Sequence, residues 1–168
     1  MFCWQITKYD PQNRDVNRVY LKDEWTDFSD IGKIFDGKEL TFTEYLGIET
    51  KYIQTVMFFM ECLGISSLKV TKLVYRARYK KNALIDGVKV VNDTYYSYEM
   101  IAFIIQSILR NKFDCMLANN DMWVQFDWDY YMTIGCLRPC ELAIAKTKEI
   151  GLFVEKEDPV YFFEDDEG

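Results

Sequence analysis

The sequence predicts a single α+β domain, residues 1–168, in which helices pack largely on one side of an antiparallel sheet. Short segments with alternating apolar and polar residues are typical of half-buried strands, and 124–134 is the clearest of them. Two longer segments, 42–63 and 97–110, have the apolar spacing of helices. The 168 residues are 49% apolar and 17% aromatic, which suits one core rich in Tyr and Phe.

The N-terminal third begins with a weak alternation over residues 1–9, which predicts an edge strand followed by a polar turn. For the long helix that comes next, Thr41 and Glu44 have the spacing of a capping box, and Gly64 stands where a helix terminator belongs. Glu49 lies in the middle of the apolar stripe of this helix. We therefore expect its carboxylate to be partly buried with an internal partner, the alternative being a contact with another protein.

The middle of the chain predicts further strands and a second helix. Residues 68–79 are rich in β-branched and aromatic types, and Asp86 and Gly87 offer a hairpin turn into a strand over 88–91. The segment 97–110 is apolar almost all round, as expected of a helix that is buried on most sides.

The C-terminal end of the chain predicts a last helix over 139–150. Pro139 suits the first turn of that helix, and Gly151 suits its end. The acidic tail, 164–168, is expected to be frayed. No repeat, low-complexity segment or linker divides the chain, which agrees with one domain.

The strand over 124–134 is expected to form a hairpin with a strand over 115–118, through a polar turn at 119–121. Because side chains alternate along a strand, its core face would carry Val124, Phe126, Trp128, Tyr130, Met132 and Ile134. Its polar face would carry Gln125, Asp127, Asp129, Tyr131 and Thr133. The two carboxylates would then lie about 7 Å apart, a separation that inverting glycosidases also use.

Three interpretations of this polar face remain open. An antiparallel sheet commonly exposes one face to water, so the face can be simply solvated. Two acids at such a separation also suit a carboxylate-dependent hydrolase, the alternative function from the enzyme class. As a third interpretation, Asp127 and Asp129 beside Tyr131 suit a surface that binds Lys and Arg side chains of a protein partner.

A second candidate site is the sequence DEWTDFSDIG, residues 23–32, which we call the acidic segment. It holds four acids, one Trp and one Phe, and no basic residue. A loop of this composition can anchor a basic partner through Trp25, Asp27 and Asp30. A loop whose Trp packs onto the core of its own chain would have the same sequence.

The composition restricts the chemistry. The chain has no histidine, which excludes Ser-His and Cys-His nucleophile pairs and imidazole metal sites. The 27 acidic and 20 basic residues give a net charge of −7, which disfavours a general duplex-binding surface and suits a cationic partner or plain solubility. Basic residues gather in the stretch 69–81, and Tyr75 and Tyr79 lie among them. An RNA-binding accessory protein is therefore another alternative.

Cysteine usage and the N-terminus point to the cytoplasm. The five cysteines form no CxxC pair and predict buried reduced thiols. A zinc site of Cys115, Cys136 and Cys140 is the minor alternative, and we expect neither a metal nor a cofactor. The N-terminal sequence MFCWQITKYD lacks the basic and apolar regions of a secretion signal. The longest apolar run, 52–65, is shorter than the roughly 20 residues that span a bilayer, so no membrane contact is expected.

Four sequence segments together resemble the immunity proteins of bacterial contact-dependent inhibition and related polymorphic toxin systems. In chain order they are DEWTDFSDIG, TFTEYLGIETKYI, FDWDYYMTIG and GLFVEKEDPVYF. The resemblance implies a small cytoplasmic protein without enzymatic activity that binds the toxic C-terminal nuclease domain, often an RNase, of an effector and blocks it. Such a toxin is expected to be basic because it grips phosphates.

An acidic inhibitor suits a basic toxin, because complementary charge accelerates encounter and opposes wrong partners. We accordingly expect a toxin-neutralising protein with no direct nucleic-acid contact. The residues expected to contact the toxin are Trp25, Asp27, Asp30, Asp127, Asp129 and Tyr131.

Overall fold

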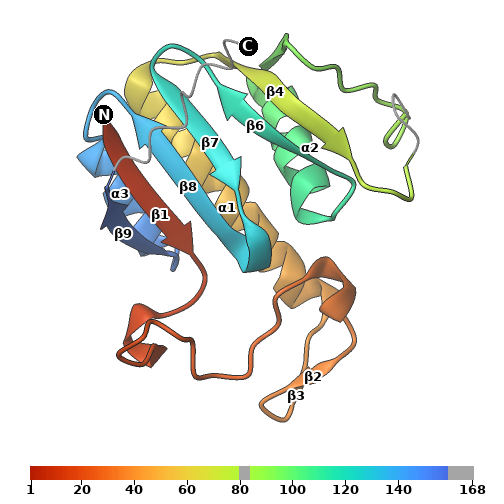
Figure 1. Cartoon of the computed structure of the whole chain (residues 1–168), viewed down its shortest axis with the longest axis vertical. Helices are drawn as coiled ribbons and strands as arrows, with labels where there is room; N and C mark the ends of the chain where they lie inside the picture. The colour runs from red at the N-terminus through yellow and green to blue at the C-terminus, as the bar shows by residue number, and fades with distance from the viewer. Residues whose placement is uncertain (80–83, 159–168) are drawn as a thin grey trace.

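The computed structural model describes residues 1–79 and 84–158, and an antiparallel sheet is the main feature of that part of the chain (Figure 1). Its seven strands are β1 (Phe2–Thr7), β4 (Ser67–Tyr75), β5 (Thr94–Ser97), β6 (Phe113–Ala118), β7 (Met122–Phe126), β8 (Tyr131–Cys136) and β9 (Phe153–Glu157). A separate small hairpin is formed by β2 (Ile34–Phe35) and β3 (Lys38–Glu39). The α-helices of the described residues are α1 (Phe42–Leu63), α2 (Tyr98–Leu109) and α3 (Glu141–Glu149).

These three helices lie behind the sheet in Figure 1, so they cover one of its faces. The strand order is β5-β4-β6-β7-β8-β1-β9, and every neighbouring pair is antiparallel. The predicted α+β class, with helices largely on one side of an antiparallel sheet, is therefore confirmed.

The core lies between the sheet and the helices and is rich in tyrosine and phenylalanine, as predicted. Tyr45, Tyr52 and Phe59 of α1 are fully buried. They belong to one apolar cluster with strand residues such as Ile6 and Val124. Helix α1 therefore crosses behind the sheet as a fixed element, and its tyrosine hydroxyls are available to position loops at one end of the sheet.

Helix α1 begins and ends where the sequence predicts. The Glu44 amide donates to the Thr41 hydroxyl, and the Thr41 amide donates to the Glu44 carboxylate, which completes the capping box. Gly64 follows in the left-handed conformation, with φ of 69°. In the middle of the helix, the Glu49 side chain is only 2% exposed and receives hydrogen bonds of 2.7 Å from both Nε and Nη2 of Arg110. The expected internal partner of Glu49 is thus confirmed.

Several boundaries differ from the prediction. Strand β1 is not at the edge of the sheet, because β9 pairs with its outer side. Residues 88–91 do not form a strand: Asp86 and Gly87 make the predicted turn with positive φ, but only Ile85 and Val88 pair across it. Strand β4 ends at Tyr75, and α3 begins two residues after Pro139. The tail 164–168 lies outside the described residues.

The prediction of one strand over 124–134 is wrong. The segment is a hairpin in which β7 ends at Phe126, residues 127–130 turn, and β8 returns antiparallel. We call residues 127–130 the hairpin loop. Trp128, which the alternation placed in the core, is 78% exposed at this loop. Asp127 and Asp129 consequently do not share a strand face, and the glycosidase-like separation derived from strand spacing does not apply.

The expectation that all five cysteines are reduced is also wrong. Cys62, at the end of α1, and Cys140, at the start of α3, form a disulfide with Cα atoms 5.9 Å apart. The other three cysteines, Cys3, Cys115 and Cys136, are buried free thiols. Cys140 is therefore not available to the zinc site weighed from the sequence, and no cluster of metal-ligating side chains occurs among the described residues. In the same residues, no helix is long and apolar enough to cross a membrane.

Gly135 of β8 lies directly beneath the indole of Trp123 on β7, its register partner. A Cβ atom added at Gly135 would overlap the rigid ring. We expect Gly135→Ala to lower the free energy of unfolding by about 1 to 3 kcal/mol in urea denaturation. Introducing the same alanine into a Trp123→Leu background, where the ring is absent, should cost less than about 0.5 kcal/mol. An equal loss of unfolding free energy in the natural and Trp123→Leu backgrounds would contradict the contact between Gly135 and the indole.

Candidate functional site

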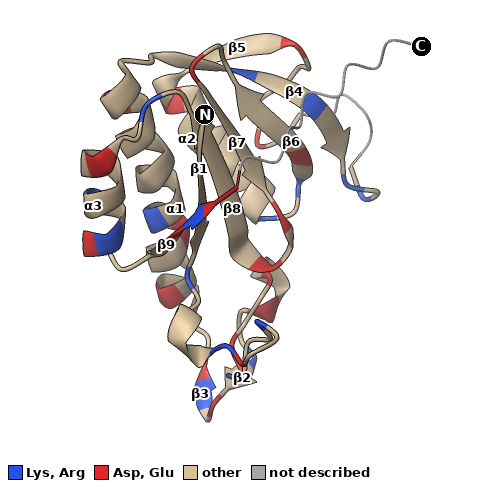
Figure 2. Ribbon diagram, turned by 60° about the vertical axis from the view of Figure 1, so that its left-hand side comes forward, with Lys and Arg blue, Asp and Glu red and all other residues tan. Residues whose placement is uncertain are grey.

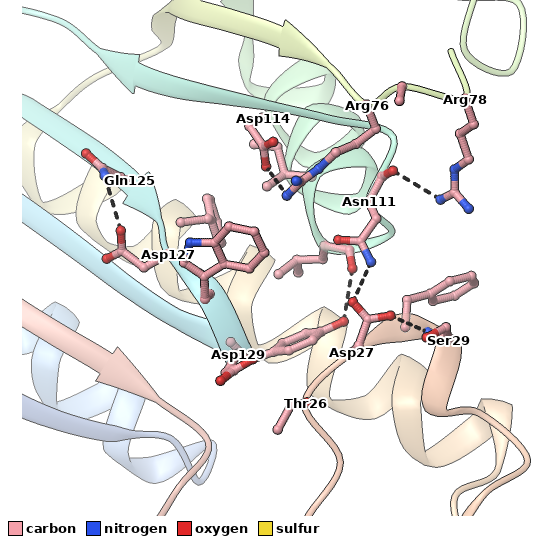
Figure 3. Close-up of a pocket in the computed structure, with 17 residues that line it drawn as sticks. Thr26, Asp27, Ser29, Arg76, Arg78, Asn111, Asp114, Gln125, Asp127 and Asp129 are labelled. Atoms are coloured by element: carbon pink, nitrogen blue, oxygen red, sulfur yellow. Dashed lines mark hydrogen bonds and ion pairs between the residues drawn. The ribbon is translucent and has the colours of Figure 1, made fainter. Parts of the chain in front are cut away.

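Three of the predicted site residues, Asp27, Asp127 and Asp129, line one open cleft of about 720 Å³ at one end of the sheet (Figure 3). Four segments line it: residues 26–29 of the acidic segment, residues 76–78 after β4, the turn between α2 and β6, and residues 125–130 around the hairpin loop. Figure 2 shows acidic residues at the end of the hairpin that β7 and β8 form. The cleft therefore brings together parts of the two candidate sites found in the sequence.

The hairpin loop is strained and firmly held. Asp129 and Tyr130 both have left-handed backbones, with φ of 57° and 61°, which costs a non-glycine residue about 1 to 2 kcal/mol. The buried Tyr130 ring offsets this cost: its hydroxyl donates to the Leu109 carbonyl at 3.0 Å and lies 2.9 Å from the Tyr45 hydroxyl. The Tyr52 hydroxyl also donates to the Tyr130 carbonyl. The loop is thus fixed to α1 and α2 before any partner arrives.

The conformation of the hairpin loop leaves the side chain of Trp128 exposed. Its ring lies 5.5 Å from the guanidinium of Arg76, whose Nη2 pairs with Asp114 at 2.9 Å. With 78% of its surface exposed, the Trp128 side chain remains available to a ligand or a protein. An exposed indole on a rigid loop, flanked by an aspartate on each side, has the character of an interface anchor.

Asp27 stands on the opposite side of the cleft and already has partners. Its carboxylate accepts from the Ser29 amide at 2.8 Å, which caps the short helix Phe28–Asp30, and from the Asn111 side chain at 2.6 Å (Figure 3). Burial opposes ionisation, but these hydrogen bonds outweigh it and hold the pKa of Asp27 below its usual value. Asp27 is therefore a structural link between the acidic segment and the end of α2.

Asp127 and Asp129 are exposed, and fewer internal partners hold them. Asp127 accepts a side-chain hydrogen bond from Gln125 at 3.1 Å. Crowding by neighbouring groups desolvates the Asp127 carboxylate and raises its pKa. Asp129 points away from the contact between Asp27 and Asn111 in Figure 3, so it belongs to the outer rim of the cleft.

The other three residues predicted to contact a partner lie outside the cleft. Trp25 is half-buried and packs edge-on against Tyr130, with ring centroids 4.9 Å apart. Asp30 is buried and accepts from the amides of Thr26 and Asp27 and from Lys33. It thereby shapes the acidic segment from within.

Tyr131 is half-buried on the face of the sheet that the helices leave open. Its ring lies 5.5 Å from the ring of Tyr9 and 6.0 Å from the guanidinium of Arg14. The structure therefore brings Asp27, Asp127 and Asp129 to one cleft and places Tyr131, like Trp25 and Asp30, elsewhere.

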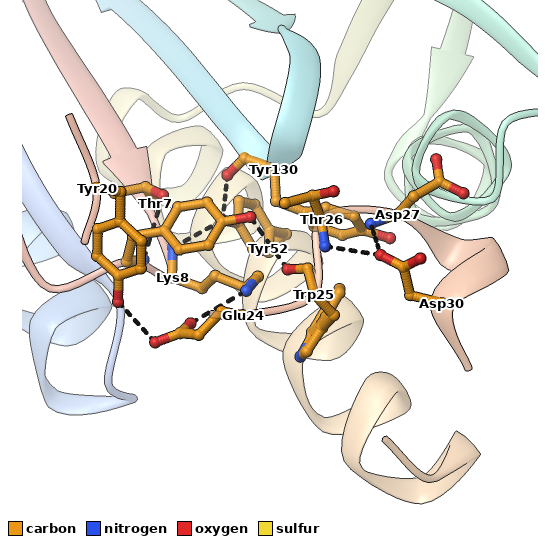
Figure 4. Close-up of polar contacts among 11 residues, drawn as sticks. Thr7, Lys8, Tyr20, Glu24, Trp25, Thr26, Asp27, Asp30, Tyr52 and Tyr130 are labelled. Carbon is orange, nitrogen blue, oxygen red and sulfur yellow. Dashed lines mark hydrogen bonds and ion pairs between the residues drawn. The ribbon is translucent and has the colours of Figure 1, made fainter. Parts of the chain in front are cut away.

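The acidic segment is fastened to the sheet through Lys8, the residue directly after β1 (Figure 4). The Lys8 ammonium lies 3.9 Å from the centroid of the Tyr9 ring and 4.1 Å from that of Trp25, and pairs with Glu24 at 3.3 Å. The side chain is only 4% exposed, and this burial lowers its pKa to about 8 even though Glu24 acts in the opposite direction. Trp25 consequently owes its position to contacts within the chain.

Because burial lowers the pKa of Lys8 from 10.5 to about 8, the unfolded chain binds the proton more tightly than the folded one. The charged ammonium opposes folding below about pH 8, and this penalty fades as the pH rises toward 10.5. We expect Lys8→Met to be more stable than the natural chain by about 1 to 2 kcal/mol at pH 7. The gain in stability is limited because the variant also loses the contacts of the ammonium with the aromatic rings.

The stability advantage of Lys8→Met should shrink steadily between pH 8 and 10.5, as measured by urea denaturation of both proteins. Because both proteins contain the same buried thiols, the contribution of thiol titration cancels in the difference between their free energies of unfolding. Lys148→Met, at an exposed position of α3, should show no such trend. An advantage that grew with pH would contradict the burial of a charged Lys8.

The basic stretch 69–81 is engaged within the chain over most of its described part. Lys69 pairs with Asp93 and Arg76 with Asp114, while Arg78 donates to two carbonyls at the end of α2. Lys80 and Lys81 lie outside the described residues. Arg76 therefore enters the cleft as an internal counter-charge to Asp114, whereas Arg78 lines the cleft while it is bonded to backbone carbonyls.

Sequence reasoning missed Trp128 as a site residue, because the alternation assigned it to the core. The available signal was local: aspartates at 127 and 129 are common turn residues, and they flank it on both sides. Asn111 and Asp114 carried no signal, since only the fold brings the end of α2 beside the acidic segment.

Comparison of the chain with protein-family models, curated proteins and solved structures finds no significant match in any of the three. Function must therefore be argued from the cleft itself. Its open shape, exposed indole and mixed carboxylates and guanidinium groups can bind a cationic protein surface. Its carboxylates with opposite pKa shifts also meet a minimum condition for acid–base chemistry.

Proposed function

We propose that this chain is an immunity protein, which binds a basic toxic nuclease domain and neutralises it. The observation that carries the proposal is Trp128, which is 78% exposed on a strained loop that three hydrogen bonds of tyrosine hydroxyls hold in place. A rigid loop loses little conformational entropy on binding, so most of the free energy of an inserted indole would appear as affinity.

The surroundings of Trp128 support a cationic partner. Asp127 and Asp129 adjoin the indole, and among the described residues they form no ion pair of the kind that engages Asp114 and Glu49. A partner's Lys or Arg could therefore stack on the indole and pair with these carboxylates. The net charge of −7 would add long-range attraction to a basic nuclease surface.

Complex formation tests this proposal. The chain should be co-expressed with the basic C-terminal domain encoded by the neighbouring upstream reading frame, and the purified material analysed by size-exclusion chromatography with light scattering. We expect one stable complex of defined stoichiometry that weakens as salt is raised, because exposed charge pairs are screened. Separate elution of the two proteins at low salt would contradict the proposal.

A second candidate is a carboxylate-dependent hydrolase, favoured by one feature of the cleft. Desolvation raises the pKa of Asp127, whereas hydrogen bonds lower that of Asp27 across the cleft. Environments that separate two carboxyl groups in this way can assign one as general acid and the other as general base.

The hydrolase candidate predicts turnover of aryl glycosides, with a bell-shaped pH profile and a loss of about 100-fold or more in Asp127→Asn. The immunity proposal instead predicts no turnover, and a folded Asp127→Asn variant that binds the toxin more weakly because one carboxylate charge is lost. A chromogenic assay of both proteins over a range of pH separates the two functions.

A further inference from the structure

A second concavity, also of about 720 Å³, lies on the other side of the acidic segment. The acidic segment, the β2–β3 hairpin and the exposed side of α1 enclose it, and we call it the Trp25 pocket. Its floor is apolar and includes Trp25, Phe35, Leu40 and Ile48. The pocket is distinct from the cleft, and Trp128 does not line it.

Gly47, in the second turn of α1, lines this pocket. Glycine inside a helix costs about 1 kcal/mol relative to alanine, and close packing against another element is the usual structural reason for it. That reason is missing here, because a Cβ atom built at Gly47 meets no atom within 4 Å. The glycine leaves open space above the helix, bounded by the half-buried ring of Trp25 and the side chain of Ile48.

The rim of the pocket is charged, with carboxylates in excess: five against three lysines. Within the rim Lys38 pairs with Glu44. No ion pair in the described part of the chain neutralises Asp23, Asp36 or Glu39. An apolar floor inside a predominantly acidic rim is complementary to an apolar side chain that has basic neighbours.

We propose that the Trp25 pocket binds an apolar side chain from a basic segment of a protein partner, with that segment lying against α1 at Gly47. The proposal extends the proposed function, since the same acidic segment borders both concavities and one basic partner could occupy both. It also gives Trp25 a role as part of a receiving surface, in place of the protruding anchor expected from the sequence.

A peptide titration tests the pocket without any toxin. The ¹⁵N-labelled full chain is titrated with the peptide acetyl-Lys-Arg-Leu-Arg-Lys-amide, and amide and indole resonances are followed by NMR. We expect the largest shifts at the amides of Gly47 and Ile48 and at the indole of Trp25. A peptide with Glu in place of each basic residue should bind at least about tenfold more weakly.

Gly47→Leu should fill the pocket and lower the affinity for the basic peptide by about tenfold or more. The thermal midpoint of this variant should stay equal to or above that of the natural chain. Gln54→Leu, at another exposed position of α1, is the matched control and should bind the peptide normally. Absence of shifts at Gly47 and Trp25, or unchanged binding by Gly47→Leu, would overturn the inference. Because no toxin is used, either result is independent of whether the proposed function holds.

Discussion

Replacing Arg110 with alanine is expected to lower the free energy of unfolding by about 3 to 5 kcal/mol. The substitution removes both 2.7 Å hydrogen bonds from Arg110 to Glu49, whose side chain is 2% exposed. The 3.2 Å bond from Gln106 would remain, but this side chain carries no charge, so the fold would have to retain a buried carboxylate without the counter-charge of Arg110. The loss should appear as a lower urea midpoint with an unchanged slope.

A double variant distinguishes the free-energy cost of the unpaired buried charge from the cost of lost packing. Glu49→Leu with Arg110→Met replaces the pair by apolar groups of similar length, and we expect this protein to lie within about 1 to 2 kcal/mol of the natural chain. The contact between Glu49 and Arg110 joins α1 to the end of α2, and the end of α2 forms one wall of the cleft. An Arg110→Ala protein as stable as the natural chain would show that this link does not hold the wall in place.

Replacing Trp128 with alanine is expected to weaken toxin binding by about 2 to 4 kcal/mol, or roughly 30- to 1,000-fold in affinity. The side chain is 78% exposed, so its removal should leave the fold and the thermal midpoint almost unchanged. Affinity should therefore fall without a loss of stability, which calorimetric titration and thermal denaturation of the same samples can establish.

Leu142→Ala is the matched control for this variant. Leu142 is a large apolar residue of α3, 67% exposed and outside the cleft. Its substitution should change the affinity by less than about 0.5 kcal/mol. Equal affinities of the Trp128→Ala, Leu142→Ala and natural proteins would remove Trp128 from the binding surface.

Local signals in the sequence predicted the helices well. The capping box of Thr41 and Glu44 and the left-handed Gly64 define the ends of α1 through contacts between near neighbours in the chain. Glu49 was predictable as a buried, paired group from its place in the apolar stripe. Its partner was not, because Arg110 is 61 residues away and only the packing of α2 on α1 brings it near.

The hairpin at 124–134 shows why alternation was insufficient. In the β7–β8 register Val124 pairs with Ile134 and Gln125 with Thr133, so paired residues are both even or both odd. A hairpin with this register keeps the same residues on each face as one long strand would. The pattern therefore predicted Val124, Met132 and Ile134 as core correctly, but it could not reveal the turn that exposes Trp128.

The candidate site was predictable only in part, for the same physical reason. Asp27 and Asp127 were recognised as members of acidic and aromatic segments, but 100 residues of chain separate them before the fold places both in the cleft. The disulfide between Cys62 and Cys140 closes a separation of 78 residues and leaves no spacing signal. Such contacts depend on strand order, which one sequence does not specify.

The central claim, that this chain neutralises a basic nuclease, is tested most directly by an RNA cleavage assay. The purified C-terminal domain encoded upstream is incubated with total RNA, alone, with an equimolar amount of the natural chain, or with the Trp128→Ala protein. We predict that the natural chain abolishes cleavage and that Trp128→Ala restores it at nanomolar protein concentrations. Undiminished cleavage by an active nuclease in the presence of excess natural chain would contradict the claim.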